Sequence, residues 1–312
     1  MESADQRGER ALLRRLHEML KHASPAGSGV PFGDDMAALT GDDRSLLWTV
    51  DMLMAGVDFV SAQHSWAAIG RKALAVNLSD CAAMAVQPVA ALCAIALCNE
   101  LTMDDAAEIL RGARDCGDAY DCPIVGGDTN SWDSPTVISI SVAGRVPSGS
   151  SPVRRDGAKP GDQVWLTGPV GGSILGRHMT FEPRIATALE INRRLAPHAM
   201  IDISDGLALD LGRILEASGC GAVLDARRLE PAIHADARRL AAADGQAARD
   251  HALHDGEDFE LIAVLPAESP EAECAALGLL PLGEITAEHG FLLDEGDGNR
   301  CPIPVRGWEH FR

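Results

Sequence analysis

The sequence predicts an α+β protein of two domains, and three observations support this prediction. Its 312 residues are enough for two domains with separate cores. Predicted strands and helices are mixed without strict alternation, which favours α+β over a doubly wound parallel sheet. Residues 147–161 are rich in Ser, Gly and Pro, which is typical of a boundary. We therefore predict an N-terminal domain over residues 1–148, with a mixed sheet and helices, and a C-terminal α/β domain over residues 149–312.

The elements of the N-terminal half follow from the spacing of apolar residues. Apolar residues at helical spacing predict helices over residues 9–21, 66–85 and 103–120. Short apolar or alternating runs predict strands over residues 46–54, 89–97, 123–125 and 136–146. A loop rich in Gly and Pro precedes the first of these strands at residues 24–35.

The C-terminal half has a similar organisation. Strands are predicted over residues 163–167, 199–203, 222–225 and 259–265, and helices over residues 184–195 and 207–218, with further helices between and after the last strands. Gly219 is suited to end the second of these helices. In both halves, acidic residues beside glycine follow short apolar strands.

Composition narrows the class of partner and the compartment. The formal net charge is −19, so the surface repels nucleic acids and anionic membranes, and we expect neither as a partner. The N-terminal residues are polar, and the longest apolar run, residues 90–98, is far shorter than the ~20 residues that span a bilayer. Eight cysteines without CxxC spacing indicate reduced thiols. We expect a cytoplasmic protein.

Aspartates at strand ends and glycine-rich turns are the most informative feature. The set is Asp34, Asp35, Asp51, Asp80, Asp128, Asp202 and Asp205. Each alone is suited to a turn or a helix cap. Asp80, however, lies inside an apolar helical pattern, where burial of a lone carboxylate costs several kcal/mol. Several carboxylates in one cavity need hard cations between them, and Mg²⁺ commonly links carboxylates to substrate phosphates.

Glycine-rich segments supply the second part of the pattern. Residues 126–129 (Gly-Gly-Asp-Thr) and 33–35 (Gly-Asp-Asp) allow the backbone to approach a phosphate closely. The sequence has neither a GxxxxGK[ST] loop nor a convincing GxGxxG after a strand. A nucleotide-using enzyme with this sequence is therefore not of the P-loop or protein-kinase type.

These motifs, in this order, resemble the thiamine-monophosphate kinase family and cover nearly the whole chain. The matching segments are residues 33–37, 51–57, 72–80, 126–129, 155–162, 183–184, 201–207 and 256–260. The family belongs to the superfamily of aminoimidazole ribonucleotide synthetase. The resemblance implies an N-terminal domain that provides most ATP and metal contacts and forms a homodimer, and a C-terminal domain that closes over the site.

The resemblance also implies roles for individual residues. Metal ligands are expected at Asp35, Thr49, Val50, Asp51, Asp80, Asp128, Asp202 and Asp205, of which Asp128 and Asp205 are expected to be catalytic. ATP contacts are expected at Gly127, Asp128, Arg155 and Ser204. Thiamine contacts are expected at Asp58, Glu257 and Trp308. A carboxylate beside a cationic thiazolium and an aromatic ring on a heterocycle are both physically reasonable.

Two positions and one segment depart from the family pattern. Asp58 stands where many members have a substrate-binding histidine. Val50 stands where threonine is common, so only its backbone carbonyl could serve a metal. The stretch between residues 173 and 183 is shorter than usual, so a helix of the C-terminal domain is expected to be missing or trimmed there.

The expected reaction is direct in-line transfer of the γ-phosphoryl group of ATP to thiamine monophosphate, which gives thiamine diphosphate with the help of several Mg²⁺ ions. The acceptor phosphate has a second pKa near ~6, so no general base is required at neutral pH. The main difficulty is to bring two polyanions together, and bound Mg²⁺ solves it.

Other functions remain open at this point. One is another ATP-dependent enzyme of the superfamily. Selenophosphate synthetase would need a reactive cysteine or selenocysteine near the N-terminus, and residues 1–30 contain none. The hydrogenase-maturation protein would need a C-terminal cysteine tail, whereas this sequence ends Trp-Glu-His-Phe-Arg. A second is a non-catalytic module that binds nucleotide or thiamine. A related acceptor, such as a hydroxymethylpyrimidine, is a third.

Overall fold

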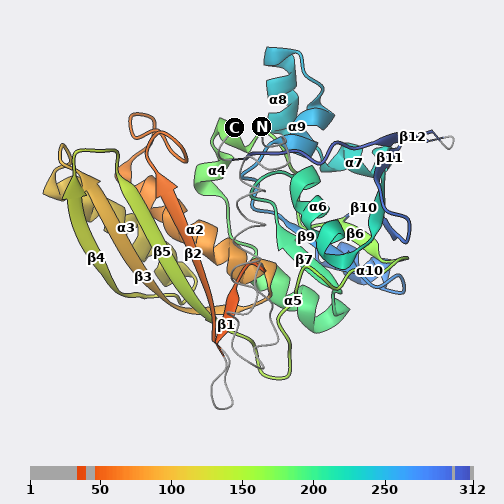
Figure 1. Ribbon diagram of the computed structural model, residues 1–312, viewed down its shortest axis with the longest axis horizontal. Coiled ribbons are helices and arrows are strands. Elements are labelled where there is room, and N and C mark those ends of the chain that lie inside the picture. The colour runs from red at the N-terminus through yellow and green to blue at the C-terminus, as the bar shows by residue number, and fades with distance from the viewer. Residues whose placement is uncertain (1–33, 40–45, 297–298, 310–312) are drawn as a thin grey trace, which may run out of the picture.

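The computed structural model describes residues 34–39, 46–296 and 299–309. It has two lobes, each built on its own sheet, with the helix α2 (Trp66–Ala83) between them (Figure 1). The α+β prediction is confirmed. The predicted helix over residues 9–21 and most of the following loop lie outside the described residues. The predicted boundary at residue 148 stays a prediction.

In the part of the chain that the structure describes, the N-terminal sheet has five strands in the order β1-β2-β5-β3-β4. Their bounds are Ala37–Leu39 (β1), Leu46–Met54 (β2), Gln87–Cys98 (β3), Ile124–Trp132 (β4) and Val137–Arg145 (β5). Only β3 and β4 are parallel; the other neighbours are antiparallel. Along β2, Leu47, Thr49 and Leu53 are buried beneath α2, whereas Val50 and Met52 face outward and are 62% and 57% exposed. The sheet therefore has one covered face and one open face.

Strand β4 differs from the sequence prediction, which ended it at residue 125. It continues through the Gly-Gly-Asp-Thr segment to Trp132 and pairs with β3 in register, Gly127 opposite Cys93 and Asp128 opposite Ala94. A Cβ atom on Gly127 would lie 1.9 Å from the carbonyl oxygen of Cys93. Gly127 therefore serves a close approach between strands rather than a turn.

Over the described ranges, the C-terminal sheet has seven strands in the order β12-β11-β8-β10-β6-β9-β7. Their bounds are Gln163–Leu166 (β6), Ala199–Asp202 (β7), Gly221–Asp225 (β8), Leu261–Leu265 (β9), Leu280–Thr286 (β10), Phe291–Asp294 (β11) and Arg300–Pro302 (β12). Only β8 and β11 pair in parallel. Strand β9 begins two residues later than predicted, because Phe259 has a left-handed backbone (φ 52°) that cannot continue a strand.

Helices cover both sheets. In the N-terminal half, α3 (Met103–Ala119) packs on α2 and begins with a capping box made by Thr102 and Asp105. The C-terminal half contains η2 (Ser173–Leu175), α4 (Arg177–Thr180), α5 (Ile185–Leu195), α6 (Leu207–Ser218), α7 (Ala226–Ala232), α8 (Ala235–Asp244), α9 (Ala248–His254) and α10 (Glu271–Ala276). The segment expected to be trimmed thus holds two short helices, η2 and α4. None of the helices in the described ranges is long and apolar enough to cross a membrane.

Helix α2 holds the two lobes together. It begins after Ser65, whose hydroxyl accepts a hydrogen bond from the Ala68 N–H, and it packs against β2 and β5 on one side and against α4, α5 and β7 on the other. Among the described residues, three side chains of α2 bond directly to the C-terminal half: Ser79 donates to Asp202 at 2.6 Å, Arg71 donates to the Phe181 carbonyl at 2.5 Å, and Lys72 pairs with Glu257. The helix is therefore buried on nearly every side, and its polar residues lie where the lobes meet.

Candidate active site

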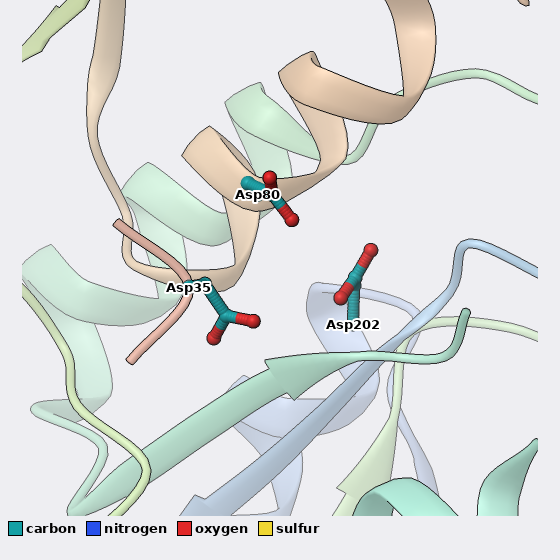
Figure 2. Close-up of side chains that lie close together, drawn as sticks. All are labelled: Asp35, Asp80 and Asp202. Atoms are coloured by element: carbon teal, nitrogen blue, oxygen red, sulfur yellow. The ribbon is translucent and has the colours of Figure 1, made fainter. Parts of the chain in front are cut away.

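Three carboxylates from distant parts of the chain meet between the lobes. Asp35 precedes β1, Asp80 lies near the end of α2, and Asp202 ends β7. Each offers an oxygen atom, and these atoms all lie within 4.8 Å of one another; the side chains point into a common space (Figure 2). The fold thus brings together three of the predicted metal ligands.

Asp51 adds a fourth carboxylate beside this cluster. It faces α2 from β2, and its backbone N–H donates to Asn77 Oδ1 at 3.1 Å. Burial raises the pKa of Asp51 to about 6. Burial, followed by the charges of neighbouring aspartates, also raises the pKa of Asp80 and of Asp202 well above the usual range. The site therefore resists ionisation unless a cation compensates the charge.

Neighbouring groups fix these carboxylates in place. The hydroxyl of Thr49 donates to Asp80 Oδ2, and Ser79 holds Asp202. Arg155 donates to Asp35 Oδ1 at 2.5 Å and lies 3.6 Å from Asp34 Oδ1. Arg155 thus supplies one positive charge beside Asp34 and Asp35.

The donor set fits a hard divalent cation. The Oδ2 atoms of Asp34 and Asp35 are buried and have no hydrogen-bond partner among the described residues. Buried oxygens without a donor are costly unless a cation or water satisfies them. With Asp80 and Asp202 close by, the clustered side chains offer carboxylate oxygens, which Mg²⁺ prefers over nitrogen or sulfur.

A cleft of about 700 Å³ runs from the cluster along the junction of the lobes. Its lining includes most of the residues predicted for metal, nucleotide and thiamine: Asp51, Asp58, Asp80, Asp202, Ser204, Asp205, Glu257 and Trp308. Asp80 and Asp202 of the acidic cluster and the predicted thiamine contacts thus line one and the same cleft.

Backbone geometry shapes the end that holds Glu257. Glu257 has a left-handed backbone (φ 61°), and its N–H donates to the Ser204 carbonyl at 2.7 Å. The Trp308 N–H donates to the Asp205 carbonyl, so the last described segment is tied to the same turn. The Asp58 carboxylate accepts from the Met54 N–H at 2.7 Å and closes the turn after β2. A left-handed non-glycine residue in a cleft is typical of a functional site.

Sequence reasoning missed several residues that shape the site. Asp210, fully buried on α6, accepts the N–H groups of Asp205 and Gly206, and Arg213 pairs with both Asp205 and Asp210. Lys72, on α2, pairs with Glu257. The available signal was the same for Asp210 and Lys72: a charged residue inside an apolar helical pattern needs a partner.

The structure does not bring Asp128 and Gly127 to the cluster within one chain. Asp128 pairs with Ala94, Ala94 with Ser139, and Ser139 with Met52, so Asp128 shares the open face of the sheet with Met52. Asp51 lies on the opposite, covered face, and β5 and β3 separate its strand from β4. The Val50 side chain also points to the open face.

Comparison with known proteins agrees with this architecture. Residues 33–146 match the family model described as AIR synthase related protein, N-terminal domain. The thiamine-monophosphate kinase of Rhodopirellula baltica is 40% identical over 259 residues, which cover 80% of each chain. That of Escherichia coli K12 is 33% identical, with 97% of this chain and 98% of the relative covered.

Solved structures agree in fold over the whole chain. A structure described as AaThiL complexed with AMPPCP and TMP superposes with a TM-score of 0.84 at 26% identity, covering 100% of this chain and 99% of the other. A chain of a structure described as a HypE-HypF complex matches at 16% identity with a TM-score of 0.74, covering 93% of this chain and 98% of the other, which shows the fold alone. The resemblance found in the sequence is therefore confirmed: the chain belongs to the thiamine-monophosphate kinase family.

Proposed function

We propose that this protein transfers the γ-phosphoryl group of ATP to thiamine monophosphate and so produces thiamine diphosphate. The observation that carries the proposal is a cleft lined both by carboxylates that can hold metal and by Glu257 and Trp308, a carboxylate and an aromatic ring. A phosphate joined to a cationic ring is complementary to this arrangement. The likeness to a structure complexed with AMPPCP and TMP supports it.

The proposed metal is Mg²⁺, in several copies. Asp35, Asp51, Asp80, Asp202 and Asp205 would hold it through carboxylates, Thr49 through its hydroxyl and Val50 through its carbonyl. When bound, Mg²⁺ neutralises and orients phosphate groups. Arg155 and Ser204 would bind the nucleotide, and Glu257 and Trp308, with Asp58 beside them, would orient the thiamine ring.

The proposed transfer is in-line and needs no side chain as general base. The acceptor phosphate is already ionised at neutral pH, because its second pKa is near ~6. The work of the chain is to bind both substrates, to hold the reacting oxygen in line and to exclude water. The cleft lies at the junction of the two lobes and is lined by residues of both, which suits it to bind two substrates together.

A homodimer is proposed to form through the open face of the N-terminal sheet. Its strands carry exposed Val50, Met52 and Leu92, an apolar surface of the kind that marks an interface. Strand β1 pairs with only Leu46–Trp48 of β2, so the rest of that edge has no strand partner in the described ranges. We propose that Asp128 of one copy reaches this edge and serves the site of the other copy.

A cytoplasmic location is proposed on the chemistry of the cysteines. All eight are free thiols and most are buried, which suits a reducing compartment.

The proposed reaction predicts a narrow acceptor range. Purified protein is incubated with ATP and, in parallel, with thiamine, thiamine monophosphate or hydroxymethylpyrimidine phosphate, with Mg²⁺ or with EDTA. We expect ADP and thiamine diphosphate in equal amounts only with thiamine monophosphate and Mg²⁺. Phosphorylation of another acceptor in preference, or ATP consumption unaffected by EDTA, would contradict the proposal.

The metal assignment predicts opposite effects of Asp80→Asn on activity and on stability. The substitution keeps the shape and the contact with Thr49 but removes one of the crowded charges. We expect kcat to fall by at least about 100-fold, the Tm in EDTA to stay the same or rise, and the increase in Tm on addition of Mg²⁺ to disappear. Asp118→Asn, an exposed aspartate on α3, is the control and should change none of these. A normal Mg²⁺-dependent increase in Tm in Asp80→Asn would argue against the assignment.

The proposed role of Asp128 predicts complementation between subunits. Asp128→Asn and Asp51→Asn are each expected to be inactive. After subunit exchange, half of the dimers carry one copy of each, and each such dimer has one intact site, so about a quarter of wild-type activity should return. Mass spectrometry confirms the exchange. Mixed dimers without recovered activity would show that Asp128 does not act across the interface.

A further inference from the structure

Lys72 is the largest side chain in the described core that is fully buried, with 1% of its surface exposed. It lies in the middle of α2 among apolar neighbours. Its Nζ donates to the Asp58 carbonyl at 2.8 Å and pairs with Glu257 Oε1. A buried ammonium group is costly unless it is paired and hydrogen-bonded, so these two contacts determine its place.

Both partners of Lys72 belong to the part of the cleft proposed for the thiamine ring. Asp58, Glu257 and Lys72 all line the cleft, although the Lys72 side chain itself is almost fully buried. Lys72 contacts the backbone carbonyl of Asp58, whereas the Asp58 carboxylate accepts a hydrogen bond from the Met54 N–H. The Glu257 side chain keeps 32% of its surface exposed, so it is held by Lys72 and still accessible from the cleft.

The Glu257 segment is otherwise hard to position. Its left-handed backbone is strained, and it follows Gly256, where a Cβ atom would lie 2.6 Å from the Ser204 carbonyl oxygen. Backbone contact with Ser204 fixes the main chain, but it does not orient the carboxylate. Lys72 supplies that orientation from the opposite lobe.

We propose that Lys72 is a positioning residue for the acceptor substrate: it orients Glu257 toward the cationic ring and fixes the turn at Asp58. This inference rests on the proposed function. The same helix carries Asp80 eight residues later, about 12 Å along the helix axis. One rigid element therefore sets the separation between the ring-binding end and the phosphate end of the cleft.

A purely structural tie between the lobes is the competing explanation, and the neighbouring residue provides a control for it. Arg71 also crosses from α2 to the C-terminal half, where it donates to the carbonyls of Phe181 and Met179. It does not line the cleft. Arg71→Met thus weakens the contact between lobes and leaves the Glu257 end intact.

The test compares Lys72→Met, Arg71→Met, Glu257→Gln and the double variant Lys72→Met/Glu257→Gln. For Lys72→Met we expect the KM for thiamine monophosphate to rise about tenfold or more, with the KM for ATP changed by less than about twofold, because only acceptor positioning is lost. The double variant should be no worse than Glu257→Gln alone. Arg71→Met should lower the Tm without separating the two KM values.

Parallel increases in both KM values for Lys72→Met, or additive effects in the double variant, would overturn the inference while the proposed function stands. If the wild-type protein itself does not phosphorylate thiamine monophosphate, the proposed function fails, and the inference with it. Should Lys72→Met not fold, Lys72→Arg keeps the charge but alters its reach, and the same separation of KM values is expected. Unchanged KM values in that variant would again overturn the inference.

Discussion

Mutual repulsion among buried carboxylates is the constraint on which the rest of this structure depends. Asp35, Asp80 and Asp202 come within 4.8 Å of one another, and Asp51 lies beside them. No apolar packing could compensate the ionised forms of such a group, so protons or cations must. The hydroxyls of Thr49 and Ser79 and the guanidinium of Arg155 hold these carboxylates in place. The fold therefore keeps the carboxylates close together despite their mutual repulsion.

Helix α2 is the element that makes this arrangement possible. It is buried against both sheets, and its few polar residues are placed where the lobes meet. Ser79 and Asp80 serve the acidic cluster, whereas Lys72 and Arg71 bond across to loops of the C-terminal half. The metal end and the ring end of the cleft are thus built on one helix, and changes in the packing of α2 are expected to affect both.

Much of the fold could be predicted from the sequence, because strands and helices have distinct apolar periods. The importance of Asp80 could also be predicted, since a carboxylate inside an apolar helix needs a cation. The face of the sheet to which Asp128 points could not, because it depends on the register of β4 against β3. The glycines before Asp128 suggested a loop, and the interstrand contact at Cys93 overrode that preference. Lys72 and Glu257 are 185 positions apart in the sequence, so the local pattern around either residue could not predict that they form a pair.

The central claim is that a divalent cation takes the place of protons in the acidic cluster. In EDTA, the raised pKa of Asp51, about 6 against 3.8, and those of Asp80 and Asp202 mean that the folded state binds more protons than the unfolded state. The free energy of unfolding should therefore fall as pH rises from about 4 through 6 and above.

The most direct measurement is the free energy of unfolding of the wild-type protein from pH 5 to pH 8, with Mg²⁺ and with EDTA. The difference between the two curves removes the contributions of groups that do not bind metal. The cation account predicts that this difference grows with pH, because Mg²⁺ displaces fewer protons as the carboxylates ionise. Curves that coincide over the whole range would contradict it.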